Sequence, residues 1–556
     1  MLAPQVVVRA PAVRVERMRF GWSELEAPLG FVIPFVAYLW IGWRLGIDVH
    51  LLPGDSLARV ANASSAVFSR DPHPEAIGFV WSPFPSLLEV PLVWLAHLWP
   101  PLLDRGMAGV VVSSLAMAGM VATVRAWMAD LGLGVMVRWG LVLAVAVHPF
   151  TVLYGANGMS EAGMVCFLVI AARWFALWLE HDRVGDLVAA GLGVAMAYLF
   201  RYEVGASAIA FAAVIGWITW RRSSGSARHR VRRASLRVAV GALPGFFTIA
   251  LWAFVSWAVV GEPFAQFSSK YGNGQNSSAV KAAAQGISVS QFSGAARVVL
   301  YAKQLVVFGT PAFIALAVLI LFGTDIANRT TAAIVMLGAP LGFQLVTAIG
   351  GSTLAWARFT IAAVPLGILL AGVVAARVTT TRQSMRVVGA ITVLVCGLSV
   401  ALAVNVTRHG SLQSSEERTE LAAVPGPYHV TAPSSIPPIL VGERIARGID
   451  ARHPLPGQIL TDSSTTFTVI LNAHDQRDYV IPADRDDERT LADPPRFGIR
   501  YILVAQPSSA YDAVAAAWPG IFNGGAGLGH LVDEWGSAAH PATHYRLYEL
   551  NHWKRR

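Results

Sequence analysis

The sequence predicts an all-α polytopic membrane protein of about eleven transmembrane helices, followed by a small C-terminal extracytoplasmic α/β domain. Three observations favour this fold class. Hydrophobic residues make up 54% of the 556 residues and charged residues only 14%, which is too apolar for a soluble protein of this length. Apolar runs of about 20 residues, long enough to span a bilayer, recur from Leu29 to Asn405. From Val406 onward the composition is polar and mixed.

The composition divides the chain into three parts. Residues 1–28 form an arm with four arginines, residues 29–405 a transmembrane domain, and residues 406–556 the C-terminal domain. Lysine and arginine beside a membrane span tend to stay in the cytoplasm. We therefore expect the N-terminal arm to be cytoplasmic and the first loop, residues 46–105, to be extracytoplasmic.

The segment Ser82–Trp99 decides on which side each later loop lies. It is apolar, but it carries three prolines, Glu89 and His97, which suit a helix at the membrane interface better than a span. If it does not span, the two basic loops Arg221–Arg237 and Arg377–Arg386 are cytoplasmic, and the C-terminal domain is outside the cell. The sequence thus predicts a multi-pass protein of the plasma membrane.

The net charge of +9 does not indicate nucleic-acid binding. A nucleic-acid-binding protein gathers its basic residues on one soluble face, whereas here they cluster in short loops between spans. The predicted partners are therefore the lipid bilayer and molecules within it, and not nucleic acid.

The C-terminal domain shows two kinds of pattern. Short runs rich in β-branched residues, such as Gln458–Thr461 and Tyr501–Val504, indicate strands. The segment Ala510–Trp518 has a helical pattern. Their alternation favours an α/β domain.

Asp55 is the first candidate for a chemical role. It follows a Pro53-Gly54 turn and opens a predicted helix in the first extracytoplasmic loop. Its carboxylate can cap that helix by accepting hydrogen bonds from free backbone N–H groups. It can also act as a general base at the membrane surface, and the two roles are compatible.

Four further charged residues lie at three predicted span boundaries on the same outer side. Glu161 is either a favourable acid in the first turn of a helix or a second acid facing Asp55. Arg201 and Glu203 interrupt an apolar run, either as an ion-paired turn or as a functional site, because charges at membrane depth are costly. Arg358 opens a late span, where it either snorkels to the interface or holds a phosphate.

Three other polar residues are weaker candidates for substrate binding. Lys270 and Tyr271 lie in the loop 261–297, which is rich in Gly, Ser and Asn and is either a plain flexible loop or a lid over a substrate. His73 lies in the first loop and lacks the spacing of a metal site. No phosphate-binding glycine loop, dinucleotide fingerprint, zinc pattern or nucleophile elbow is present.

At these residues the sequence resembles the GT-C integral-membrane glycosyltransferases, and within them the bacterial mannosyl-, arabinosyl- and aminoarabinosyl-transferase type. The segments that carry the resemblance follow the order of the family's motifs and share one side of the membrane: GDSLARVANA around Asp55, FVWSPFPSLLEVPL, NGMSEAGMVCFL around Glu161, RYEVGASAIAFA from Arg201, and ARFTIAAVPLGILLAG around Arg358. They extend over nearly the whole membrane part.

The resemblance implies a hexosyl- or pentosyltransferase that uses a polyprenyl-phosphate sugar as donor and an envelope glycan, lipid or protein as acceptor. It implies inversion at the transferred sugar, with Asp55 as general base, Glu161 as a second catalytic acid, and Arg201, Arg358 and Lys270 neutralising the departing phosphate. Asp55 lacks a neighbouring acid, so the metal ligands are unknown; a divalent cation (Mg, Mn or Ca) is left open and no other cofactor is expected.

Two readings from other classes compete with the transferase. A transporter or lipid flippase would place its polar residues near the bilayer midplane and show inverted repeats, whereas here they lie at one rim. A non-catalytic scaffold whose tail binds an envelope polymer would not need Asp55. Activity of an Asp55→Asn variant separates these readings.

Overall fold

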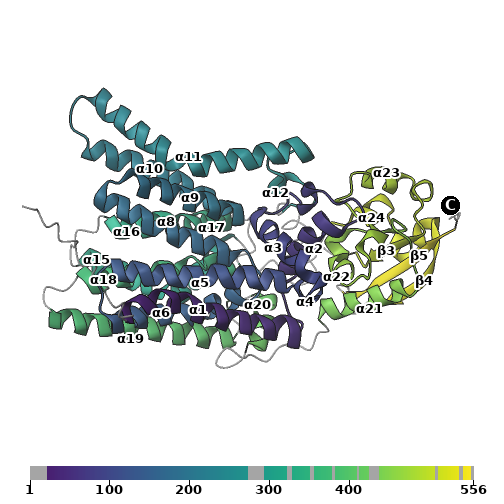
Figure 1. Cartoon of the computed structure of the whole chain (residues 1–556), viewed down its shortest axis with the longest axis horizontal. Coiled ribbons are helices and arrows are strands. Elements are labelled where there is room, and N and C mark those ends of the chain that lie inside the picture. The colour runs from purple at the N-terminus through teal and green to yellow at the C-terminus, as the bar shows by residue number, and fades with distance from the viewer. Residues whose placement is uncertain are drawn as a thin grey trace, which may run out of the picture.

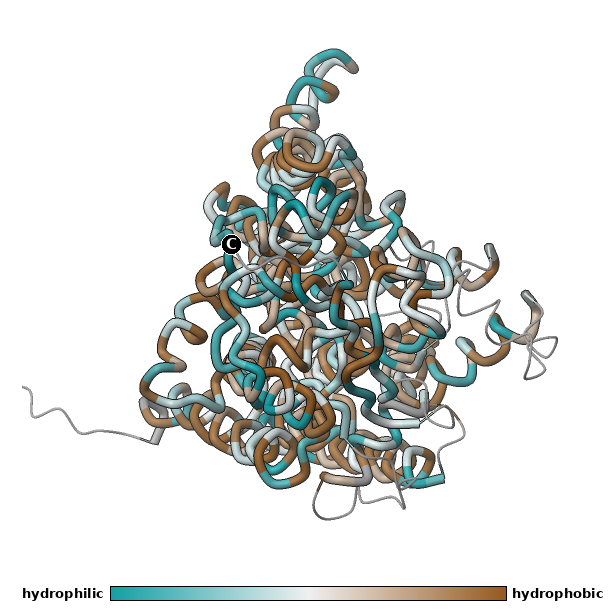
Figure 2. Tube along the Cα trace, turned by 90° about the vertical axis from the view of Figure 1, so that its right-hand side faces the viewer, coloured by the Kyte–Doolittle hydropathy of each residue, from teal (hydrophilic) through white to brown (hydrophobic). Residues whose placement is uncertain are grey.

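A bundle of long helices with a small sheet domain at one end forms the computed structural model of this chain, as Figure 1 shows, and the predicted fold class is confirmed. Figure 2 views the molecule from the C-terminal end, where the helices of the bundle taper to a projection at the top. The structure describes residues 22–272, 294–321, 328–350, 356–377, 382–409, 412, 414–424, 437–507, 511–537 and 543–551. Part of the loop 261–297, residues 273–293, therefore lies outside the described residues.

Fourteen helices make up the described part of the bundle. They are α1 (Trp22–Trp43, extended by a π-helical turn, Arg44–Asp48), α5 (Met107–Asp130), α6 (Val135–Ala146), α7 (Pro149–Ala156), α8 (Glu161–His181), α9 (Val184–Phe200), α10 (Gly205–Arg222), α11 (Ala227–Val260), α14 (Gly294–Phe308), α15 (Thr310–Leu321), α16 (Asn328–Ala333, continued by a π-helical turn, Ile334–Gly338), α17 (Ala339–Gly350), α18 (Ala363–Arg377) and α19 (Arg382–His409).

Among the described residues, eight helical segments are long and apolar enough to cross a membrane, and up to ten if two bent pairs are each one span. The pairs α6–α7 and α14–α15 bend by 62° and 78°. Pro149 and Pro311 lie at these bends, where a proline has no N–H to continue the preceding helix. The expectation of about eleven spans differs from ten by α9, an apolar helix whose 17 residues stand at the lower limit of span length.

Helix α9 is nevertheless built into the bundle between α8 and α11. Its contact with α11 depends on two glycines: a Cβ on Gly191 would lie 2.1 Å from the carbonyl oxygen of Gly241. The deepest part of the core lies around α5, α8 and α18, where Trp127, Phe175 and Trp178 are almost completely buried.

Short helices cover the end of the bundle that faces the C-terminal domain. They are α2 (Gly54–Phe68), a 3₁₀ turn (Pro74–Ile77), α3 (Phe84–Trp94), a second 3₁₀ turn (Leu95–His97) and α4 (Pro101–Asp104). At 11 residues α3 is about 16 Å long, half of what a span needs, and it lies beside α2 in Figure 1. The structure therefore agrees with an interfacial position for Ser82–Trp99.

The C-terminal domain contains a five-stranded sheet in the order β2-β1-β3-β5-β4, in which β1, β2 and β3 are parallel and β5 is antiparallel to β3 and β4. The predicted strands and helix correspond to β1, β3 and α24. The elements are α21 (Pro438–Asp450), β1 (Ile459–Leu460), α22 (Ser463–Leu471), β2 (Tyr479–Val480), α23 (Asp487–Ala492), β3 (Tyr501–Ala505), α24 (Ala513–Ala517), α25 (Ile521–Gly524), β4 (Gly529–Trp535) and β5 (Tyr545–Leu550).

The C-terminal domain is docked on α2 and on the loop that follows it. Leu57 and Val60 of α2 share an apolar cluster with Ile439 and Leu471 of the domain. Around this cluster, three arginines form ion pairs across the boundary: Arg70 with Asp484 and Asp486, Arg105 with Glu443, and Arg485 with Asp71. The helix that carries Asp55 is thus held from the C-terminal domain as well as from the bundle.

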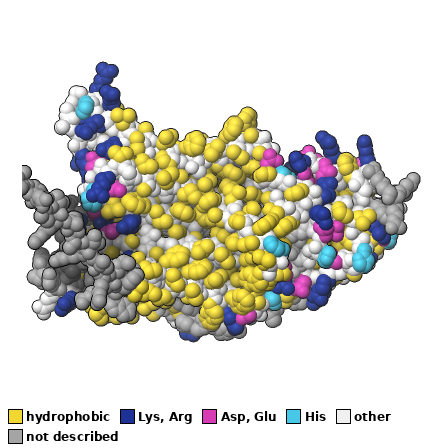
Figure 3. Space-filling view, in the orientation of Figure 1, with side chains coloured by type: hydrophobic (Ala, Val, Ile, Leu, Met, Phe, Trp, Pro, Cys, Tyr) yellow, Lys and Arg dark blue, Asp and Glu magenta, His cyan; other side chains and the backbone are white. Residues whose placement is uncertain are grey.

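The most basic segment lies at the opposite end of the molecule. Lys and Arg side chains gather over the turn between α10 and α11, while apolar side chains cover the middle of the bundle (Figure 3). The 34 residues of α11 span about 51 Å, so its arginine-rich start extends beyond a hydrocarbon core of about 30 Å. The arginine-rich start of α11 and the C-terminal domain thus lie at opposite ends of the bundle, as they must if the first is cytoplasmic and the second extracytoplasmic. Which end faces the cytoplasm stays a prediction.

Candidate active site

Asp55 is the second residue of α2 and does not cap that helix. Pro53 occupies the N-cap position, and no side chain makes a capping hydrogen bond there. The Asp55 carboxylate instead accepts a hydrogen bond from Nη1 of Arg358 at 3.1 Å, and 37% of its side chain is exposed. Burial raises the pKa of Asp55, but the charges of Arg358 and Arg59 outweigh this effect, so the pKa is lowered and the carboxylate is ionised at neutral pH.

Glu161 begins α8 and is buried behind Asp55. Ser160 holds the N-cap position of α8, but its side chain makes no capping hydrogen bond. Oε1 of Glu161 accepts a hydrogen bond from Nη1 of Arg201 at 2.7 Å and lies 3.8 Å from Nε of Arg358. Among the described residues Oε2 of Glu161 has no hydrogen-bond partner, so this buried carboxylate has an unused acceptor.

The turn between α9 and α10 supplies the third part of the site. Arg201 binds Glu203 through two parallel N–H···O bonds of 3.1 Å, and Gln344 of α17 donates to the same carboxylate. The expected ion pair between Arg201 and Glu203 is confirmed, and Arg201 also reaches Glu161. A functional role for this turn stays a prediction. A bidentate pair of this kind fixes the guanidinium in one orientation.

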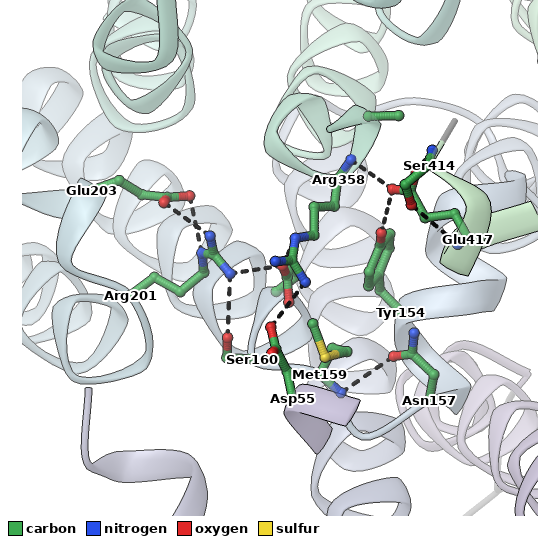
Figure 4. Close-up of polar contacts among 12 residues, drawn as sticks. Asp55, Tyr154, Asn157, Met159, Ser160, Arg201, Glu203, Arg358, Ser414 and Glu417 are labelled. Atoms are coloured by element: carbon green, nitrogen blue, oxygen red, sulfur yellow. Dashed lines mark hydrogen bonds and ion pairs between the residues drawn. The ribbon is translucent and has the colours of Figure 1, made fainter. Parts of the chain in front are cut away.

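These residues form one chain of charges, Asp55–Arg358–Glu161–Arg201–Glu203. Figure 4 shows Asp55 turned toward Arg358 and Glu203 turned toward Arg201. Its members come from four segments: α2, the start of α8, the α9–α10 turn and the turn before α18. Each arginine lies between two carboxylates, which compensates the cost of burying these charges. An anion that enters the site must therefore compete with carboxylates for the guanidinium groups.

Arg59 is a further buried cation that the sequence patterns did not single out. It lies one helical turn after Asp55, donates to the Asp55 carbonyl oxygen at 3.3 Å, and its guanidinium carbon lies 4.9 Å from the centre of the Trp81 ring. Among the described residues no carboxylate lies within 4 Å of it, and its Nε has no partner. The spacing of four residues from Asp55 is the signal in the sequence that could have identified it.

Glu89 of α3 was also missed as a candidate. It is completely buried, and among the described residues neither carboxylate oxygen has a hydrogen-bond partner. Burial raises the pKa of Glu89 to about 8, against the lowering effect of Arg59, so the side chain is protonated at neutral pH. An acid within the apolar, proline-rich run of the first loop was the available signal.

We predict that Glu89→Gln removes a loss of stability at alkaline pH. The raised pKa means that the folded protein holds this proton better than the unfolded chain. The protonated Glu89 therefore contributes fully to the free energy of unfolding below the unfolded pKa of about 4.5, and this contribution is lost as pH rises toward 8. Each tenfold difference in proton affinity between the folded and unfolded states corresponds to roughly 1.4 kcal/mol. The melting temperature of Glu89→Gln relative to wild type should therefore increase between pH 5 and pH 9; an unchanged difference would contradict the prediction.

A helix beyond the last membrane-length helix also reaches the site. Helix α20 (Ser415–Ala423) packs on the bundle, where Leu421 and Val424 are part of the apolar core. Its Glu417 accepts hydrogen bonds from the backbone N–H of Arg358 and from the hydroxyl of Tyr154. Nothing in the sequence pattern indicated that this segment returns to the membrane domain.

The remaining predicted binding residues lie at the C-terminal domain or beside it. Tyr271 donates to Asp462 at 2.8 Å, and Nζ of Lys270 lies 5.7 Å from the centre of the Tyr511 ring. His73 lies against Asp71 and Glu75, next to the ion pair between Asp71 and Arg485. A role for these three residues in substrate binding stays a prediction.

The site residues do not form a recognisable metal centre. Within the part of the chain that the structure describes, no three carboxylate, histidine or cysteine side chains converge on one point. Asp55 and Glu161 both point at Arg358, whose positive charge opposes a cation between them. A divalent cation at this site stays an open prediction.

Comparisons with known proteins gave no matching family model and no matching curated protein. Solved structures similar to this chain include ArnT from Cupriavidus metallidurans bound to undecaprenyl phosphate, with 13% identity and a TM-score of 0.44 over 95% of this chain and 100% of that chain. Another is the apo form of the Archaeoglobus fulgidus oligosaccharyltransferase, with 12% identity and a TM-score of 0.40 over 86% of this chain and 70% of that chain.

Proposed function

We propose that this chain is a GT-C-type membrane glycosyltransferase that moves a sugar from a polyprenyl-phosphate donor to a cell-envelope acceptor on the extracytoplasmic face. The observation that carries the proposal is the arrangement of Arg358 between Asp55 and Glu161, with Arg59 and Arg201 beside it, at one end of the bundle. The site contains an ionised carboxylate that can act as a base and three arginines that can bind an anion. It lies at the end of the helix bundle, where the headgroup of a donor lipid would lie.

The arginines support a phosphate-bearing donor. Guanidinium groups bind phosphate oxygens bidentately and keep their charge when buried. Arg59 carries no carboxylate partner among the described residues, so it can bind an anion without breaking an ion pair. The polyprenyl chain would remain among the apolar helices, while its phosphate lies at the boundary where the arginines are.

The proposed reaction is an inverting displacement. Asp55 takes the proton from the acceptor hydroxyl, the acceptor oxygen bonds to the anomeric carbon, and the bond between that carbon and the phosphate oxygen breaks on the opposite side. The phosphate leaves with the electron pair, and Arg358, Arg59 and Arg201 stabilise its growing charge in a partly dry site. Glu161 and Glu203 keep two of these arginines oriented before the donor arrives.

Donor binding also makes Asp55 a stronger base in this scheme. Arg358 donates to the Asp55 carboxylate in the structure, and this contact lowers the pKa of Asp55. A phosphate that draws Arg358 away removes part of that effect, so the pKa of Asp55 rises when the donor is in place. The sugar transferred is a pentose or a hexose, and the acceptor is a glycan, lipid or protein of the envelope.

Replacing Arg358 by glutamine tests the donor assignment. The change should weaken binding of decaprenyl phosphate to the protein in nanodiscs by about 10- to 100-fold, since a charge-assisted hydrogen bond contributes about 1.5–3 kcal/mol. The measurement is native mass spectrometry over a range of lipid concentrations. Arg173→Gln is the matched control, because Arg173 forms an exposed ion pair with Asp130 outside the site.

Equal binding by Arg358→Gln and wild type would contradict the phosphate assignment. A second measurement separates the transferase from a transporter or flippase. Wild-type protein that binds the lipid, moves it between leaflets and forms no glycosylated product from a labelled polyprenyl-phosphate sugar would support the transporter instead.

A further inference from the structure

Glu417 is the point at which the segment after the last membrane-length helix meets the site. Its side chain is buried, and it accepts three hydrogen bonds from three parts of the chain. Oε1 accepts from the hydroxyl of Tyr154 at 2.7 Å and from the backbone N–H of Arg358 at 2.9 Å, and Oε2 accepts from the backbone N–H of Ser414 at 2.7 Å. Figure 4 shows these contacts beside the ion pair between Arg358 and Asp55.

The bond to Arg358 fixes the backbone from which the guanidinium extends. Arg358 is the second residue of a 3₁₀ turn, Ala357–Thr360, and N–H groups at the start of such a turn have no partner within it. Glu417 supplies an acceptor for this buried N–H group from outside the turn. This contact holds the main chain of Arg358 in place, and the position of the main chain determines where the guanidinium lies relative to Asp55.

We propose that Glu417 is a positioning residue that sets the placement of Arg358 for donor binding, so that α20 is part of the transferase site. The inference rests on the proposed function, because it assigns Arg358 to the donor phosphate. A transferase truncated after α19 would keep Asp55, Glu161 and all three arginines, but Arg358 would lose an acceptor that fixes its main chain.

Helix capping is the competing explanation for Glu417. Ser414 and Glu417 form a capping box, in which each side chain accepts from the other's backbone N–H. The capping bond uses Oε2, whereas the bonds to Tyr154 and Arg358 use Oε1. Ser414→Ala weakens the cap and leaves the Oε1 contacts in place, so it is the matched control for a purely structural role.

The test is a double-mutant cycle between Glu417→Ala and Arg358→Gln in the full-length protein. The measured quantities are the KM for a polyprenyl-phosphate sugar, the kcat, and the dissociation constant of decaprenyl phosphate. We expect Glu417→Ala to raise the donor KM and the dissociation constant about tenfold, and to add little once Arg358 is already replaced, because contacting residues of one network are not additive. Ser414→Ala should lower the melting temperature and leave the donor KM close to that of wild type.

Two results would overturn the inference: a Glu417→Ala effect that is undiminished in the Arg358→Gln background, or a Ser414→Ala variant with the same donor KM as Glu417→Ala. If Glu417→Ala does not fold, Glu417→Asp, which is one methylene shorter, allows the same comparison. Failure of the proposed function looks different, since Arg358→Gln alone would then leave donor binding unchanged. A strong Arg358→Gln effect with no Glu417→Ala effect refutes only the positioning role.

Discussion

Asp55→Asn is expected to reduce sugar transfer by about 10²- to 10⁴-fold, the usual contribution of a general base. Asparagine has nearly the same shape and can still accept a hydrogen bond from Arg358, so the site should keep its geometry and lose only the basic group. Donor binding should be retained or strengthened, because Arg358 no longer faces a negative charge. The measurement is single-turnover transfer from a labelled polyprenyl-phosphate sugar, beside decaprenyl phosphate binding.

Asp48→Asn is the control for this experiment. Asp48 lies at the start of the same loop and forms an exposed ion pair with Arg44, so its replacement should leave transfer unchanged. Product formation by Asp55→Asn at the wild-type rate would exclude Asp55 as the base. Loss of donor binding together with transfer would show instead that Asp55 has a structural role.

Arg201→Ala is expected to lower the free energy of unfolding by about 3–5 kcal/mol, the cost of breaking a buried ion pair. The replacement leaves two carboxylates, Glu161 and Glu203, buried without their main cation. Thermal unfolding in detergent should therefore shift to a clearly lower temperature. A second change, Glu203→Gln, should recover part of the loss, because it removes one of the two uncompensated charges.

The comparison for Arg201→Ala is Arg173→Ala. The ion pair between Arg173 and Asp130 is exposed, and such pairs contribute about 0–1 kcal/mol. Equal melting temperatures for Arg201→Ala and Arg173→Ala would show that the chain of charges does not hold the α9–α10 turn. If adding Glu203→Gln recovers none of the stability that Arg201→Ala removes, the destabilisation does not come from the uncompensated charge of Glu203.

The sequence predicted most of the fold because apolar spans and strand patterns are local properties. The length of an apolar run indicates a span without knowledge of its neighbours. This rule reached its limit at α9, whose 17 residues stand at the lower end of the range for a span although the helix lies inside the bundle. Strand patterns located β1 and β3 within one or two residues.

Local reasoning succeeded less well for individual side chains. The helix that follows Asp55 was predicted, but its expected role as the cap was wrong, since Pro53 holds that position and the carboxylate turns toward Arg358. Ser160 holds the N-cap position of α8, but its hydroxyl accepts from Arg201 and makes no capping hydrogen bond. In both cases a partner distant in sequence, which local propensities cannot include, determines where the side chain points.

The sequence by itself determined that this is a helical membrane protein with an α/β domain at its C-terminus, and that Asp55, Glu161, Arg201 and Arg358 lie at ends of apolar segments. Only the tertiary structure decided that these four charges meet in one chain, that Arg59 and Glu89 are buried beside them, and that Glu417 returns from beyond the last membrane-length helix. The reason is physical: burying a charge costs free energy wherever it stands in the sequence. The opposite charge that offsets this cost is brought by folding from another segment, 40 residues away for Glu161 and Arg201 and 303 residues away for Asp55 and Arg358.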